Sequence, residues 1–276
     1  MSYSFRSGQR YRMPTHFGPS LGPRQGPGGR RYDCVDTPKQ VIVRAAFEAQ
    51  AAQLADFLPP HFELRDPALL YVTFCYITEA RWLAGRGYNT FGISVPARYR
   101  GPKEVVEGEL LLVLWENMAD PIITGREELG FSKVYCELPE PQFLQDDVIC
   151  RASWDGCQFA TLQLTRAQET AVEALPQPQP SAGLLHYKYI PRTGAPGESD
   201  AEYPVLTPAT NSHLKIDQAM IAQGAACQFR HSTWEELPTL VHIVNALAAL
   251  SLGGCVEATV LRTRGAKDLS DQRVLG

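Results

Sequence analysis

The feature that most constrains the fold is a series of short β-branched and aromatic runs separated by turn-forming residues. Runs of this length and composition predict β-strands, because such side chains pack well on a pleated surface. The clearest of them are Gln40–Phe47, Leu69–Ile77, Val105–Trp115, Val148–Trp154 and Cys157–Leu164. The last two flank Asp155-Gly156, a two-residue hairpin signal. A largely antiparallel β protein is therefore expected.

Two helices and a closing strand complete the predicted elements. An alanine-rich helix is expected over Glu48–Leu58, where Pro59-Pro60 ends it, because proline lacks the N–H and clashes with the preceding turn. A second helix is expected over Pro238–Leu252, followed by a strand over Val256–Arg264. Many antiparallel strands with two or three helices predict an α+β protein built on a β-barrel or sandwich.

Composition narrows the class of protein. The chain has 276 residues, 44% of them hydrophobic, and a net charge of −4, which is ordinary for a globular protein with a sizeable core. Its seven cysteines are odd in number and lack CxxC spacing, so we expect reduced thiols and a cytoplasmic location. The most apolar segment, Leu237–Leu252, is too short to span a bilayer and contains His242 and Asn245. No membrane association is expected.

The N-terminal segment has a different composition from the rest. Residues 1–31 contain six arginines, six glycines and four prolines without any Asp or Glu, so the remainder carries a net charge of −10 (−4 − 6). Such a segment cannot bury a core of its own, and we predict an extended arm over residues 1–37 and a single domain over residues 38–276. The arm could bind nucleic acid, but the acidic remainder would repel phosphate. Packing on a neighbouring acidic subunit is therefore the preferred interpretation.

One lysine stands in unusual surroundings. The chain has six lysines against twenty arginines, and Lys133 lies among Phe131, Val134 and Tyr135. A free lysine is almost entirely protonated at pH 7, whereas burial in an apolar pocket penalises the ammonium form. A neutral amine can attack a carbonyl and form a Schiff base. A strand-end lysine that reaches into water would look the same in sequence, so the lysine alone decides nothing.

The residues around Lys133 resemble the active-site segment of the acetoacetate decarboxylase family. Gly125-Arg126-Glu127, followed by an aromatic residue and Lys133, is similar to the family's Gly-Arg-Glu turn and Schiff-base lysine. Tyr88 with Val95-Pro96 and the later segment Leu185–Pro191 resemble two further family motifs, in the same order. The resemblance covers most of the chain from about residue 38. It implies a closed, cone-like β-barrel with the lysine inside, commonly in a homo-oligomer.

Two positions depart from the family's pattern. The decarboxylases usually carry a second lysine directly after the Schiff-base lysine, where this chain has Val134. They also carry a glutamate in the Tyr…Val-Pro loop, where this chain offers Thr90. Desolvation must then lower the pKa of Lys133 without help from an adjacent ammonium group. Because adjacent side chains of a strand point to opposite faces, Val134 is expected to point into the barrel wall.

Other chemistries find no support in the sequence. The six histidines are scattered without ligand spacing, so no metal site is predicted. Dinucleotide, nucleotide and α/β-hydrolase motifs do not occur, and the expected chemistry needs no cofactor. Glu116, Glu127 and Glu128 are candidate acid–base groups near Lys133 in the sequence. Arg126-Glu127 is expected to form an ion pair, whereas Glu128 and Tyr88 are expected to face the substrate.

These observations predict a Schiff-base lyase that acts on a small oxo acid through an iminium on Lys133. Decarboxylation of an acetoacetate-like 3-oxo acid is the primary hypothesis. A pyruvate-dependent aldolase-dehydratase that uses the same lysine is an alternative, and a non-catalytic protein that binds a small acid is another. The predicted partners are a small oxo acid and further copies of the chain, with no nucleic acid.

Overall fold

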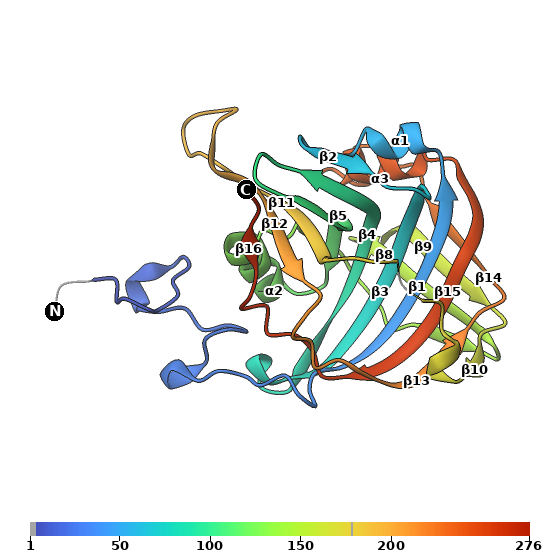
Figure 1. The fold of residues 1–276 in the computed structure, drawn as a ribbon, viewed down its shortest axis with the longest axis horizontal. Helices are drawn as coiled ribbons and strands as arrows, with labels where there is room; N and C mark the ends of the chain where they lie inside the picture. The colour runs from blue at the N-terminus through green and yellow to red at the C-terminus, as the bar shows by residue number, and fades with distance from the viewer. Residues whose placement is uncertain (1–3, 178) are drawn as a thin grey trace.

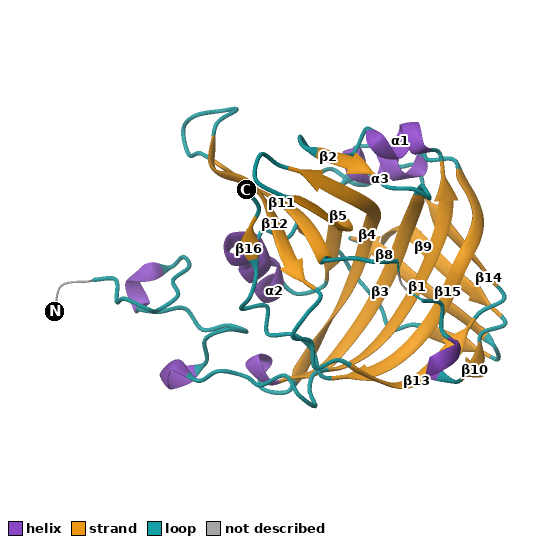
Figure 2. Ribbon diagram, in the orientation of Figure 1, coloured by secondary structure: helices purple, strands orange, loops and turns teal. Residues whose placement is uncertain are grey.

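A large curved β-sheet packs against a smaller sheet, with short helices at the margins (Figures 1 and 2). The structure is a computed structural model that describes residues 4–177 and 179–276; residues 1–3 of the predicted arm lie outside this range. The strands of the large sheet are β1 (Lys39–Ala49), β2 (Phe62–Leu64), β3 (Leu69–Ala80), β4 (Arg86–Arg100), β5 (Val105–Glu116), β6 (Lys133–Tyr135), β10 (Gln168–Thr170), β11 (Gly183–Pro191), β12 (Ser199–Pro208), β13 (Lys215–Ile221), β15 (Leu252–Arg264) and β16 (Arg273–Val274). The small sheet consists of β7 (Gln142–Leu144), β8 (Asp147–Trp154), β9 (Cys157–Thr165) and β14 (Gly224–Phe229).

The helical elements are few and short. The α-helices are α1 (Ala51–Ala55), α2 (Ala119–Thr124) and α3 (Val241–Ala248). A π-helix, η4 (Gly125–Leu129), continues α2. The 3₁₀ turns are η1 (Thr15–Phe17), η2 (Pro27–Gly29), η3 (Arg81–Leu83) and η5 (Val172–Ala174). The expectation of a mainly antiparallel β protein with a few helices is confirmed.

The hydrogen-bonded strands of the large sheet form an open series, in which the first and last of the described strands do not pair. The strands follow the path β10-β13-β15-β1-β3-β4-β5-β11-β12-β16, with β2 beside β4 and β6 beside β5. Only β11 and β6 pair in parallel with β5; the other pairs are antiparallel. The end strands β10 and β16 have three and two residues, and among the described residues no ladder joins them. The expected closed barrel is therefore not confirmed.

An aromatic stack joins the two sheets in the core. Ring centroids lie 4.2 Å apart for Phe74 and Phe91 and 4.9 Å apart for Phe91 and Trp115. Trp115 then contacts Phe159 of the small sheet, with the ring centroids 5.5 Å apart and the rings tilted by 42°. Phe91 and Trp115 are direct partners in the β4–β5 ladder, and all four side chains are fully buried. Since neighbouring residues of a strand point to opposite faces, the next pair, Thr90 and Glu116, lies on the other face of the sheet.

Local structure matches the sequence at the hairpin and differs at the helices. Asp155 and Gly156 both have positive φ, as a two-residue hairpin between β8 and β9 requires. The two predicted helices are shorter than expected, because a strand takes up one end of each predicted range and turn residues take up the other. Glu48 stays paired with Leu69 in the β1–β3 ladder, and Leu252 already begins β15.

Where the structure describes it, the arm before β1 adds no strand to either sheet. Its described part contains η1, η2 and an isolated bridge between Gly22 and Gln25. It extends from the sheet on the side of α2 (Figure 1). The division at residue 37 stays a prediction. Within the described residues, no helix has the length and apolar character that crossing a membrane would require.

Candidate active site

Lys133 is the first residue of β6, a short strand beside the end of β5. The chain reaches it through α2 and η4, which end at Gly130 in the left-handed conformation (φ 79°). A glycine at this position lets the helix stop and the chain turn back. A Cβ here would also meet the side chain of Lys188 at 2.8 Å, so the turn packs directly on β11. Lys133 then pairs with Leu114, which places its side chain on the same face as Glu116.

The ammonium group of Lys133 binds a buried glutamate. Its Nζ lies 2.8 Å from Glu116 Oε1 and donates to the carbonyl oxygen of Pro121 at 3.0 Å. The ring of Phe131 lies 5.1 Å from Nζ. The two charged side chains are only 9% and 1% exposed, so a lysine and a carboxylate are held together away from bulk water.

Burial shifts the pKa values of this pair toward neutral groups. It lowers the pKa of Lys133; the charge of Glu116 and its hydrogen bond oppose the shift, and the charge of Arg24 adds to it. Burial raises the pKa of Glu116, and the interaction with Lys133 opposes that. Removing either charge from water is unfavourable, so passing the proton from amine to carboxylate costs less than it would in water. The pair can therefore supply a neutral, nucleophilic amine.

Lys133 lines a cavity of about 360 Å³ whose walls come from several parts of the chain, among them Pro121 and Thr124 of α2. The large sheet contributes Gln40, Ile77 and Tyr88, with Trp82 from η3 beside them. The arm contributes Pro23, Arg24, Tyr32 and Cys34, and a segment near the C-terminus contributes residues 266–269. Tyr88 stays a protonated phenol near neutral pH, because burial raises its pKa and the nearby charge of Glu116 adds to the effect.

Glu128 binds the arm and does not line this cavity. Its carboxylate accepts hydrogen bonds from Arg12 and Arg24, and Arg10 Nη1 lies 3.7 Å away. The sequence placed Glu128 toward the substrate; its carboxylate is instead occupied by arginines that are more than a hundred residues away in the chain. The residues next to Glu128 in the sequence give no signal for such distant partners.

Arg126 and Glu127 make other contacts in place of the predicted ion pair. Arg126 Nη1 donates to the backbone oxygen of Lys133 at 2.8 Å and thereby holds the start of β6. The backbone oxygen of Glu127 accepts from Lys188 Nζ at 2.7 Å. No ion pair between Arg126 and Glu127 occurs in the described structure. Both residues support the turn, and neither lines the cavity of Lys133.

Comparison with known proteins identifies the family. The family model for acetoacetate decarboxylase matches residues 12–266. The chain belongs to the acetoacetate decarboxylase family. No curated protein matches it.

Several solved structures share the fold at low sequence identity. A structure of acetoacetate decarboxylase aligns with a TM-score of 0.64 and 15% identity over 87% of this chain and 89% of that chain. The enduracididine biosynthesis enzyme MppR complexed with pyruvate aligns with a TM-score of 0.63 and 14% identity, over 91% and 95% of the two chains. Acetoacetate decarboxylase from Legionella pneumophila aligns with a TM-score of 0.59 and 18% identity, over 91% and 92%.

The buried carboxylate beside Lys133 belongs to Glu116, the last residue of β5. Thr90 stands where the resemblance led us to expect a glutamate, and Glu116 lies directly opposite Thr90 in the β4–β5 ladder. The carboxylate is thus present on the adjacent strand. In the sequence, the glutamate at the end of the apolar strand Val105–Glu116 was visible as a candidate. Only the folded structure shows that it pairs with Lys133.

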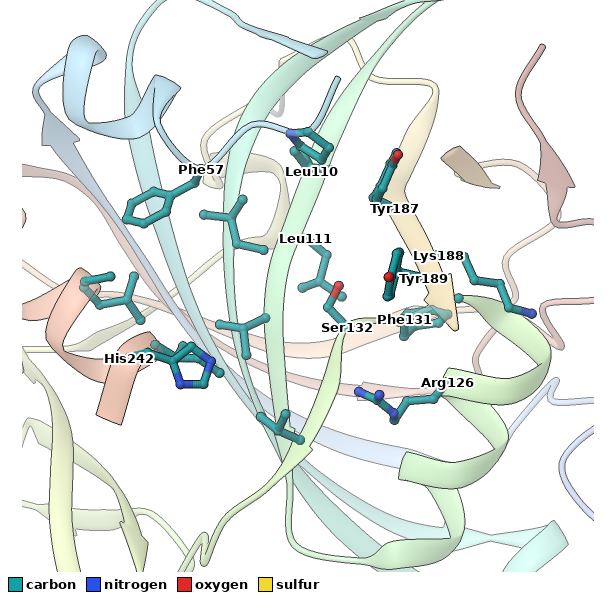
Figure 3. A pocket seen from close by; sticks show the side chains of 18 of the residues that line it. Phe57, Leu110, Leu111, Arg126, Phe131, Ser132, Tyr187, Lys188, Tyr189 and His242 are labelled. Atoms are coloured by element: carbon teal, nitrogen blue, oxygen red, sulfur yellow. The ribbon is translucent and has the colours of Figure 1, made fainter. Parts of the chain in front are cut away.

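Val134 lies on the other side of β6 from the Lys133 cavity. It lines a second, mostly apolar cavity of about 560 Å³ between β5, β11 and α3 (Figure 3). Phe57, Tyr187 and His242 border this space, and Arg126 extends toward it from η4. A lysine at position 134 would therefore not accompany Lys133. The positive charge near Lys133 comes instead from Arg24 of the arm, which the sequence did not reveal.

Proposed function

We propose that this chain is a carbon–carbon lyase that binds a small oxo acid as a Schiff base on Lys133, and that it decarboxylates an acetoacetate-like 3-oxo acid. The observation that carries the proposal is the buried Lys133–Glu116 pair at 2.8 Å in the wall of a cavity. Family membership supports lyase chemistry in general.

Schiff-base formation requires a proton acceptor beside the amine. Glu116 takes the proton from Lys133, whose lone pair then attacks the ketone carbon and forms the C–N bond. The carbinolamine oxygen receives the proton back from Glu116 and leaves as water. The product is a protonated imine that faces a restored carboxylate, so the positive charge stays paired in a buried site.

The iminium then accepts the electrons of the breaking bond. When the C–C bond to the carboxylate breaks, its electron pair moves into the iminium, and CO2 leaves behind a neutral enamine in place of a carbanion. Glu116 takes up a proton from solvent, and its raised pKa favours this protonated form; it then protonates the enamine carbon. Water then hydrolyses the iminium, releases the ketone and restores Lys133.

A second candidate reaction uses the same lysine with pyruvate. The enamine of pyruvate would attack an aldehyde, and dehydration would follow. The cavity favours keeping this candidate, because about 360 Å³ is more than a three- or four-carbon acid needs and lies in the range of larger ligands. Tyr32, Trp82 and Tyr88 offer aromatic surface for a second reactant. MppR, whose structure is similar, was solved with pyruvate.

Reductive trapping tests the proposal. The protein is incubated with acetoacetate or pyruvate, reduced with borohydride and analysed by intact mass and peptide mapping. We expect one adduct on Lys133 that is lost in Lys133→Ala. Lys188, the other buried lysine of the described residues, should carry no adduct and provides the internal control. If neither acid nor a wider panel of oxo acids gives an adduct, the chain is a non-catalytic protein that binds a small acid.

We also propose that the enzyme works in the cytoplasm as a homo-oligomer, without a cofactor. Its seven cysteines are free thiols, which suits a reducing compartment. Ile123 and Tyr135 are 44% and 48% exposed near the active site and would be covered in an assembly. Light scattering of the full chain and of a chain lacking residues 1–31 measures the assembly. Tight, salt-dependent RNA binding with unchanged mass would assign the arm to nucleic acid instead.

A further inference from the structure

We infer that Arg24, carried into the site by the arm, binds the carboxylate of the oxo acid and restricts the enzyme to acids. This inference rests on the proposed Schiff-base function. Arg24 and Lys133 line the same cavity, although they are far apart in the sequence. A cation at one part of the cavity and a nucleophilic amine at another match the two functional groups of an oxo acid.

The guanidinium of Arg24 has unused hydrogen-bond donors. Its side chain is only 4% exposed, and Nη2 binds Glu128. Nε and Nη1 are buried and have no hydrogen-bond partner among the described residues. Leaving buried donors without an acceptor is unfavourable, and more so when the group is charged. A carboxylate in the cavity would supply the missing acceptors.

Glu128 cannot neutralise the arginines around it. Arg10, Arg12 and Arg24 share this one carboxylate, so its single negative charge faces three positive ones. Of the three arginines, Arg24 alone lines the cavity of Lys133, and it is also the most buried. Arg10 and Arg12 therefore anchor the arm on η4, whereas Arg24 has charge and donors left for a ligand.

The other cations that line the cavity are already paired. Arg81 Nη1 binds both carboxylate oxygens of Asp33 at 2.9 and 3.0 Å. Lys267 binds Asp271 at 2.5 Å, and Lys133 binds Glu116. Among the cavity-lining residues that the structure describes, Arg24 is thus the cation with buried, unpartnered donors.

The test compares acids with their methyl esters. Borohydride trapping is measured against concentration for pyruvate and methyl pyruvate, and for acetoacetate and methyl acetoacetate. In Arg24→Gln we expect the half-saturating concentration of the acids to rise about ten- to a hundredfold, since a hydrogen bond to a charged group contributes roughly 1.5–3 kcal/mol. The esters are the reference at each pH, because removing the charge of Arg24 also changes the pKa of Lys133. That change affects the trapping of acids and esters alike.

Arg12→Gln is the matched control. Arg12 lies on the same arm and binds the same carboxylate, but it does not line the cavity. It should leave the ratio of acid to ester affinity unchanged, and Arg24→Lys should restore part of the preference for acids. Equal effects of Arg24→Gln on acids and esters, or no effect, would overturn the inference. If wild type traps neither acids nor esters, the Schiff-base function fails; if it traps both equally well, only the role of Arg24 fails.

Discussion

Gly125 lies against the side chain of Lys133 and leaves it the space to reach Glu116. A Cβ added at Gly125 would lie 2.5 Å from both Cδ and Cε of Lys133 and 2.7 Å from Nζ. Ordinary contacts of a Cβ begin at 3.4 Å, so Gly125→Ala must displace the end of Lys133 by about 0.9 Å (3.4 − 2.5). The hydrogen-bond distance of 2.8 Å to Glu116 does not survive a shift of that size in most directions.

The fold should tolerate this substitution. Gly125 has helical angles (φ −68°, ψ −42°), which alanine adopts readily and with a helix propensity better by about 1 kcal/mol. The clashing atoms are the far end of a flexible side chain, which can move without backbone rearrangement. We therefore expect the melting temperature to stay the same or rise slightly. Trapping of the oxo acid should slow by about a hundredfold, the cost of misplacing a reacting group by 1 Å.

The assay is the rate of the borohydride-trapped adduct, measured beside thermal unfolding. Gly254→Ala is the matched control, because a Cβ there meets its nearest neighbour at 3.9 Å. In a Lys133→Ala background, Gly125→Ala should have no destabilising effect, since the clashing atoms are gone. Wild-type trapping by Gly125→Ala would refute the reasoning, and so would unfolding of Gly125→Ala that Lys133→Ala does not relieve.

Three further variants test the environment of the site. Glu116→Gln should slow trapping by about 10²–10⁴-fold, because the amine loses its proton acceptor. It should also shift the acid limb of the pH profile to lower pH, because Glu116 raises the pKa of Lys133. An unchanged trapping rate would exclude Glu116 as the proton acceptor. Burial, with the charge of Lys133, lowers the pKa of His186 to about 3. The unfolded chain then binds more protons between pH 6.5 and 3, so stability falls as the pH is lowered through this window, by about 4–5 kcal/mol at most. His186→Leu should flatten that loss in urea titrations at pH 7 and 4.5, and an equally steep loss would contradict this. Val134→Lys should lower the melting temperature and leave the pH profile of trapping unchanged; an acid-shifted profile with unchanged melting would place position 134 in the active site.

Much of the local structure followed from the sequence. Runs of β-branched and aromatic residues predicted the long strands of the large sheet, and Asp155-Gly156 predicted the β8–β9 hairpin. These signals are local, because the side-chain period of a strand and the positive φ of a turn depend on adjacent residues. The apolar surroundings of Lys133 could be predicted for the same reason, because its aromatic neighbours lie beside it in the chain.

The partners of Lys133 were decided by tertiary structure. Glu116 is seventeen residues away (133 − 116), and it meets the lysine because β6 pairs in parallel with β5. Arg24 is 104 residues from Glu128, and only the path of the arm across η4 brings it into the cavity. The sequence determined which faces of the strands are apolar and which residue is a candidate nucleophile. Strand pairing and long-range contacts decide which distant segment covers each face. No local pattern of residues specifies such contacts.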